Sequence, residues 1–260
     1  MTALDDVLAD LEVLGDRLDG LVAGLSEDGW TTPTPAAGWT VKHQVAHLAW
    51  TDEVARLAAT DKARWDEVVL AALADPAGFV DRAANEGAAA SGASVLARWR
   101  AARAGLVAAL RAHPSGARMP WFGPPMSSTS MATARLMETW AHSLDVHEAL
   151  RAEQPVDDRI RHVAHLGVRT RDFAFGVHGL EPPADEFHVS LTAPSGEVWQ
   201  WGPADAAQSV RGPAYDFCLL VTQRRHRSRL ALVADGPDAD RWLDIAQAFA
   251  GPPGVGRLPA

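Results

Sequence analysis

Hydrophobic residues recur at spacings of three and four along the first two thirds of the chain, the period of amphipathic helices. The first stripe runs from Leu4 to Leu25, and a turn-rich stretch (SEDGWTTPTPAAG) separates it from Thr40, a good helix N-cap. Further helices are predicted over residues 41–80 with a break at Asp75-Pro76, and over 91–110, 131–151 and 155–179. These elements predict an all-helical N-terminal domain built on a four-helix bundle.

The pattern changes near Pro182, where alternation with period two replaces the helical spacing. Strands are predicted over residues 187–192, 198–201, 206–210 and 229–233, and helices over 212–222 and 238–250. We therefore expect an α+β protein with two domains, a helical bundle over residues 1–181 and a smaller α+β domain over residues 182–260.

Charge and composition exclude several classes of partner. The formal net charge of −9 over 260 residues argues against a nucleic-acid partner, which requires a basic surface. No apolar run approaches the ~20 residues that span a bilayer, and the acidic N-terminal segment lacks the pattern of a signal peptide. The single cysteine, Cys218, is expected in the core and fits a reducing cytoplasm. The oligomeric state stays open.

One set of residues has the spacing of a metal site. Glu138 and His142 lie four residues apart on a predicted helix, so their side chains leave the same face one turn apart. His47 lies midway along another helix, next to the inward-facing Leu48. Two histidines and a glutamate can hold a divalent ion and leave positions open for chemistry. The alternative is an ordinary surface pair between Glu138 and His142.

Two motifs carry a resemblance to a known family. Residues 38–48 (GWTVKHQVAHL) resemble the helix-entry motif of the DinB-like, mycothiol-dependent maleylpyruvate isomerase superfamily, in which a histidine binds metal, here His47. Residues 138–142 (ETWAH) resemble the second half of that family's site. The resemblance implies a DinB-like bundle, a sterol-carrier-like C-terminal domain, a bound divalent ion such as Zn²⁺, and the thiol cofactor mycothiol.

The sequence departs from the family at His43, whose position is usually acidic and would complete a capping box with Thr40. His43 and His47 also form an HxxxH pair that could chelate a metal instead, although a capping or solvated role for His43 is expected. Asp145 could orient a ligand histidine, but a solvated helix face is expected for both Asp145 and His147.

The second domain offers one candidate for anion binding. Thr222-Gln223-Arg224 resembles a short family motif that supplies an arginine to the active site. Arg224 is therefore expected to grip a carboxylate of the thiol cofactor or of the substrate, while Arg225 is a weaker candidate. The rest of the basic stretch, including Arg227 and Arg229, is interpreted as a solvated turn.

These features lead to three hypotheses of function. The first is a metal-dependent, mycothiol-using isomerase or thiol transferase that acts on a small electrophile, because a metal lowers the pKa of a coordinated thiol. The second is a metal-dependent hydrolase of a small ester, amide or thioester. The third is a non-catalytic protein that binds a metal and an apolar ligand. Dependence on added mycothiol separates the first hypothesis from the other two.

Overall fold

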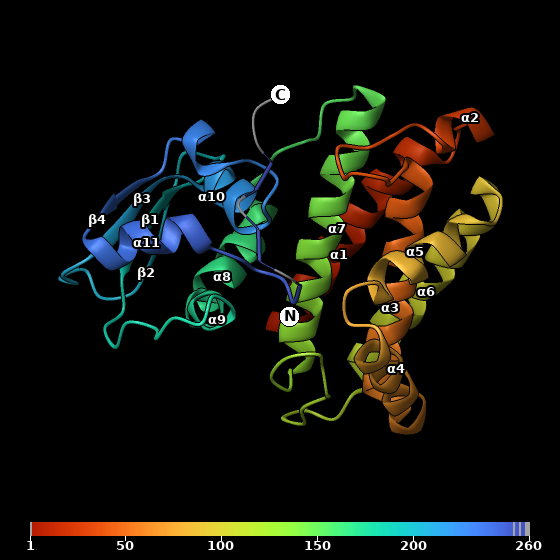
Figure 1. The fold of residues 1–260 in the computed structure, drawn as a ribbon, viewed down its shortest axis with the longest axis horizontal. Helices are drawn as coiled ribbons and strands as arrows, with labels where there is room; N and C mark the ends of the chain where they lie inside the picture. The colour runs from red at the N-terminus through yellow and green to blue at the C-terminus, as the bar shows by residue number, and fades with distance from the viewer. Residues whose placement is uncertain (1, 252, 255, 258–260) are drawn as a thin grey trace. The chain divides into compact units, whose positions relative to one another are not determined.

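The computed structural model describes residues 2–251, 253–254 and 256–257 (Figure 1). Its contacts divide the chain into two compact units, Met1–Gln154 and Pro155–Ala260. No helix among the described residues is both long enough and apolar enough to span a bilayer.

The first unit is all-helical, as predicted. Its helices are α1 (Ala3–Val22), α2 (Glu27–Trp30), α3 (Val41–Thr60), α4 (Lys62–Ala74), α5 (Phe79–Ala88), α6 (Gly92–Ala112) and α7 (Ser128–Leu150). The four longest are α1, α3, α6 and α7, in agreement with the predicted bundle. The region predicted as one interrupted helix over residues 41–80 forms three helices, because Asp61 and Gly78 stand as N-caps inside it.

Side-chain caps fix where the long helices begin. The hydroxyl of Thr2 accepts a hydrogen bond from the backbone N–H of Asp5, whose carboxylate accepts from Thr2 in return. Ser91 and Ser127 cap α6 and α7 by accepting hydrogen bonds from the backbone N–H groups of Ser94 and Ser130. These bonds satisfy N–H groups that have no partner within the helix, so each start is well defined.

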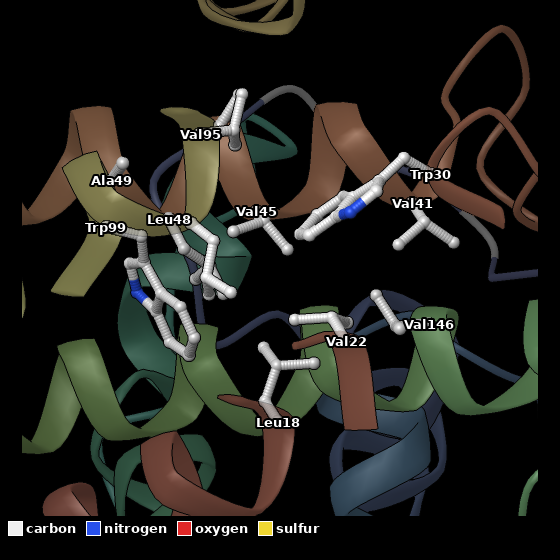
Figure 2. Close-up of a cluster of buried hydrophobic side chains, with 12 residues drawn as sticks. Leu18, Val22, Trp30, Val41, Val45, Leu48, Ala49, Val95, Trp99 and Val146 are labelled. Atoms are coloured by element: carbon white, nitrogen blue, oxygen red, sulfur yellow. The ribbon is translucent and has the colours of Figure 1, made fainter. Parts of the chain in front are cut away.

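The bundle core joins residues from five helices. α1 packs on α7, and α3 packs on both α6 and α7. Figure 2 shows how Leu18 of α1, Leu48 of α3 and Trp99 of α6 point into one cluster of buried side chains. Trp30 of α2 lies so close to Gly92 that a Cβ there would collide with the indole, which fixes the short helix against the start of α6. This packing holds α3 and α7 side by side, the arrangement on which the site depends.

The second unit combines helices with one mixed sheet. Its elements are η1 (Asp158–Ile160), α8 (Arg161–Arg169), α9 (Arg171–Val177), β1 (His188–Thr192), β2 (Val198–Trp201), β3 (Ser209–Pro213), α10 (Ala214–Val221), η2 (Arg227–Arg229), β4 (Val233–Asp235) and α11 (Pro237–Ile245). The strand order is β2-β1-β3-β4, with β1 and β3 parallel and the other pairs antiparallel. The α+β class is therefore confirmed.

The contacts divide the chain earlier than the change in composition suggested, between Gln154 and Pro155 instead of near residue 182. The reason is that the helical segment over 155–179 packs within the second unit. α8 lies against α10, where a Cβ on Gly167 would approach Val221 to 2.8 Å, and α9 packs on α11. A helical composition alone does not reveal which core a helix joins.

The bounds of four further elements differ from the prediction. The helix expected over 155–179 is broken into η1, α8 and α9, and the helix expected over 238–250 ends at Ile245. The two later strands lie further along the chain than expected, at β3 and β4. Residues 227–229, the last of which was expected to begin a strand, form a 3-10 turn that is capped by the side chain of His226, and Arg227 binds Asp240 and Asp244 of α11.

Candidate metal centre

Three side chains predicted as ligands converge between α3 and α7. Nε2 of His47 lies 3.6 Å from Oε2 of Glu138, and Nε2 of His142 lies 3.1 Å from the same oxygen. One ligand atom from each residue falls within 4.8 Å of the other two. The i, i+4 spacing on α7 places Glu138 and His142 on one face, and the packing of α3 on α7 brings His47 to them.

The electrostatics of the cluster keep Glu138 ionised. Burial alone would raise the pKa of Glu138, but its close contacts with the imidazoles of His142 and His47 outweigh burial and hold that pKa well below its usual range. The carboxylate is therefore charged at neutral pH, the form that binds metal.

The donor set fits a divalent cation. Nδ1 of His142 contacts the side-chain oxygen of Gln44, so Nε2 is the atom that faces Glu138. In a neutral ring this Nε2 carries a lone pair, and it faces a carboxylate oxygen that is also an acceptor. Two acceptors at 3.1 Å attract each other only through a cation or a proton between them. Two imidazoles and one carboxylate form the nitrogen and oxygen set found in catalytic zinc sites.

Aromatic rings line the cluster on one side. The ring of Trp39 lies 5.2 Å from that of His47 and stacks on His142 at 6.0 Å between centroids. Trp39 is itself held in place, because its Nε1–H donates to Asp81 Oδ1 at 2.9 Å. The helix entry GWTV thus supplies one wall of the site as well as a helix start.

His43 lies outside this cluster and has a structural role. Its Nδ1 accepts hydrogen bonds from the backbone N–H and the hydroxyl of Thr40, at 3.2 and 2.8 Å. Its Nε2 bonds Asn85 Oδ1 at 3.1 Å. The imidazole thus completes the capping box of α3 in place of the usual acid, which confirms the capping role that was one of the two expected for His43.

Replacement of His43 by alanine should therefore weaken the fold and leave metal binding intact. Loss of a cap costs about 0.5–2 kcal/mol, so the free energy of unfolding should fall by that amount. Urea denaturation and metal analysis of the purified variant measure the two effects. A variant with normal stability and lost metal would move the site to His43 and His47.

A buried ion pair lies next to the candidate ligands. Arg135, one turn before Glu138, donates from Nε to Asp52 Oδ1 at 2.9 Å and from Nη2 to the hydroxyl of Thr51. That hydroxyl donates to the backbone carbonyl of His47 at 2.8 Å. Arg135 and Asp52 are almost fully buried, and spacing in the sequence did not single them out.

Two neighbours of the ligands on α7 differ from the prediction. Asp145 and His147 were expected on a solvated face, yet both are buried. His147 donates from Nδ1 to the carbonyl of Ser143 at 2.8 Å, and burial lowers its pKa despite that bond. The reason is that α7 is covered on more than one side, by α1 and by α3.

The basic stretch of the second unit is more ordered than predicted. Arg224 is half-buried, and its Nη1 donates to the carbonyl of Thr222 at 2.9 Å. Arg227, expected in solvent, binds Asp240 and Asp244 of α11. Arg229 is exposed, as predicted. Cys218 is fully buried, and burial raises the pKa of its thiol far above the usual range, in agreement with a core position.

Comparison with known sequences identifies the first unit. Residues 11–147 match a family described as mycothiol maleylpyruvate isomerase N-terminal domain, and residues 183–235 match one described as wyosine base formation. Relatives from two strains of Mycobacterium tuberculosis, both described as uncharacterized proteins, are 60% identical over 250 residues. These alignments cover 96% of this chain and 97% of each relative.

Solved structures show the same fold. A crystal structure of the mycothiol-dependent maleylpyruvate isomerase matches with a TM-score of 0.57, and one of its point mutants with 0.60. Both are 13% identical and cover 90% of this chain and 95% of their own. The family match spans more than half of the 260 residues and contains His47, Glu138 and His142. The chain therefore belongs to the mycothiol maleylpyruvate isomerase family.

Proposed function

We propose that this protein is a divalent-metal-dependent enzyme that uses mycothiol to isomerise, or to transfer a thiol to, a small electrophilic substrate. The observation that carries the proposal is the convergence of His47, Glu138 and His142, whose ligand atoms fall within 4.8 Å of one another. Membership of the family supports the thiol cofactor, since the solved relatives are described as mycothiol-dependent.

His47, Glu138 and His142 would hold the metal, and zinc suits two imidazoles and a carboxylate. A metal and mycothiol bound there would supply a thiolate at neutral pH, which can add to an activated double bond or displace a leaving group. The protein's own part is to keep the carboxylate of Glu138 ionised, to fix both imidazoles, and to present an apolar wall through Trp39. Three protein ligands leave coordination positions open, as catalysis requires.

Mycothiol should bind to zinc-loaded protein and release about one proton on binding, because a coordinated thiol loses its proton. Calorimetric titrations in two buffers of different ionisation enthalpy measure both quantities. S-methylated mycothiol is the matched ligand, since it keeps the sugar and the carboxamide groups but has no thiol to ionise, and it should bind more weakly without proton release.

Equal binding of mycothiol to zinc-loaded and metal-stripped protein would contradict the thiol role. Turnover of esters or thioesters that is indifferent to mycothiol would favour the metal-dependent hydrolase. Absence of any turnover, together with tight binding of an apolar ligand, would favour the non-catalytic binding protein. The cytoplasmic location suggested by the single cysteine stays a prediction.

Arg224 is proposed to bind an anionic group of the cofactor or the substrate. Its backbone is held firmly, because its N–H donates to the carbonyl of Leu219 at 2.8 Å after a left-handed turn at Gln223. A guanidinium in a fixed position can grip a carboxylate with two parallel hydrogen bonds. The support for this role is the resemblance of Thr222-Gln223-Arg224 to the family motif.

Replacement of Arg224 by lysine should weaken binding of the anionic partner about ten- to a hundredfold, because an ammonium cannot reproduce the bidentate contact. Metal content should stay unchanged, which separates this residue from the ligands. Arg229→Ala is the control, since Arg229 is exposed, whereas Arg227 binds α11 and is unsuitable. Similar affinities of the Arg224 and Arg229 variants for mycothiol and substrate would remove Arg224 from the site.

A further inference from the structure

A chain of hydrogen bonds leads from the loop before α3 to one of the proposed metal ligands. The hydroxyl of Thr34 lies 2.9 Å from the backbone carbonyl oxygen of Trp39, and the side-chain nitrogen of Gln44 lies 2.9 Å from that hydroxyl. The side-chain oxygen of Gln44 then meets Nδ1 of His142. Gln44 has no exposed surface, so water does not compete for either end of its amide.

Each bond in this chain has only one possible direction. The carbonyl of Trp39 can only accept, so Thr34 must use its single hydroxyl hydrogen there. The oxygen of Thr34 can then only accept from Gln44, which turns the NH₂ group of the amide toward Thr34. The amide oxygen therefore faces His142, and because that oxygen can only accept, Nδ1 of His142 must carry a hydrogen.

The backbone of the loop fixes the position of Thr34, the residue at which this chain of hydrogen bonds begins. The N–H of Thr34 also donates to the carbonyl of Trp39 at 2.8 Å, and Pro33 forms an isolated bridge with Thr40. Thr34 stands between two prolines, Pro33 and Pro35, which restrict its backbone to extended conformations. The loop therefore presents the hydroxyl of Thr34 in one place.

The two imidazoles of the cluster differ in whether Nδ1 has a hydrogen-bond partner. Nδ1 of His47 is buried and has no hydrogen-bond partner within the described part of the chain, whereas Nδ1 of His142 has Gln44. An imidazole with a hydrogen on Nδ1 directs the lone pair of Nε2 outward, here toward Glu138 and the centre of the cluster. Partners of this kind orient ligand histidines and raise their basicity.

We propose that Gln44 is a positioning residue that keeps a hydrogen on Nδ1 of His142 and so leaves Nε2 to face the metal. Because Thr34 orients Gln44, the loop over residues 33–40 is then part of the metal centre. The role of Gln44 rests on the proposed function insofar as His142 binds metal. The hydrogen on Nδ1 does not rest on the proposed function, since it follows from hydrogen bonds made by the protein alone.

The first experiment measures zinc affinity by competition with a chromophoric chelator. Gln44→Leu keeps the size of the side chain but removes the acceptor, and its zinc affinity should fall about 10- to 100-fold. Gln44→Glu should restore affinity to near the wild-type value, because a carboxylate oxygen accepts the same bond. Gln154→Leu is the matched control, since Gln154 bonds only the carbonyl of Trp140 among described contacts, and it should bind zinc normally.

Unfolding midpoints of the metal-free variants in urea show whether a loss of zinc affinity comes from a less stable fold or from a misplaced His142. A loss of affinity that appears in Gln44→Leu and is rescued in Gln44→Glu, at matched stability, supports the proposal. Zinc binding by a folded Gln44→Leu variant within about twofold of the wild type would overturn it, since a lost outer partner costs far more. Thr34→Val provides a second variant, which frees the amide of Gln44 to turn over and should also weaken zinc binding.

The second experiment needs no metal. Nitrogen-15 NMR of the metal-free protein distinguishes imidazole rings that carry a hydrogen on Nδ1, with or without one on Nε2, from rings that carry a hydrogen on Nε2 alone. His142 should have hydrogen on Nδ1 in the wild type and a mixture of both forms in Gln44→Leu. Hydrogen on Nε2 alone in the wild type would overturn the proposal. Failure of the wild type to bind any divalent ion would instead overturn the proposed function and leave the tautomer result standing.

Discussion

The purified protein should hold about one divalent ion per chain, and replacement of His47 or His142 by alanine should remove most of it. Each variant loses one of three protein ligands, and structural zinc sites are worth about 10–16 kcal/mol in total, so the affinity should fall more than about 100-fold. Metal content by plasma emission spectroscopy, before and after dialysis against a chelator, measures the loss. Glu138→Gln should show the same loss, because it removes the charge but keeps the shape.

His43→Ala is the matched control for these variants, because His43 lies one turn from His47 on α3 but bonds Thr40 and Asn85. It should keep its metal. Retention of metal by His142→Ala and its loss from His43→Ala would contradict the assignment. Wild-type protein that binds no divalent ion, even when refolded with zinc, would exclude the metal centre altogether.

The Arg135→Met variant should lose about 3–5 kcal/mol of unfolding free energy, because it leaves the carboxylate of Asp52 buried without its partner. Only 2% of the side chain of Arg135 and 4% of that of Asp52 are exposed, so solvent cannot replace the lost contact. Urea denaturation with linear extrapolation measures the change.

Two comparisons sharpen this expectation. Arg98→Met breaks a similar pair with Glu53, but 39% and 33% of these side chains are exposed, so it should cost no more than about 1 kcal/mol. The double variant Arg135→Met with Asp52→Leu removes both buried charges and should recover much of the stability. Equal costs for Arg135→Met and Arg98→Met would show that burial does not govern the Arg135 pair.

The sequence predicted the structure correctly where apolar residues recur on one face of a helix, and where two candidate ligands lie on the same face. The stripe along residues 4–25 predicted α1, and the spacing of Glu138 and His142 predicted a pair that the structure brings to His47. Both patterns are local, since they depend on residues three or four positions apart. The family resemblance supplied the connection between the two helices, which no local pattern contains.

The residues that the sequence did not single out contact partners that are far away along the chain. Gln44 meets His142, and Asp52 meets Arg135, across 98 and 83 positions respectively. A glutamine and an aspartate in an amphipathic helix are normally assigned to its solvated face, and only tertiary packing reveals their burial. The domain boundary was displaced for a similar reason, because α8 and α9 look like further bundle helices until their contacts with α10 and α11 are known.

The order of the helices along the chain determines when during synthesis the first unit can fold. α1 packs mainly on α7, which is the last helix of that unit to leave the ribosome. At about 5–20 residues per second, the apolar face of α1 waits for several seconds until α7 emerges. His47 is made early and waits with it, so the proposed metal centre can assemble only after residues 128–150 have appeared. Until then the nascent chain exposes the apolar stripes of α1 and α3, and we expect it to need protection from aggregation during that interval.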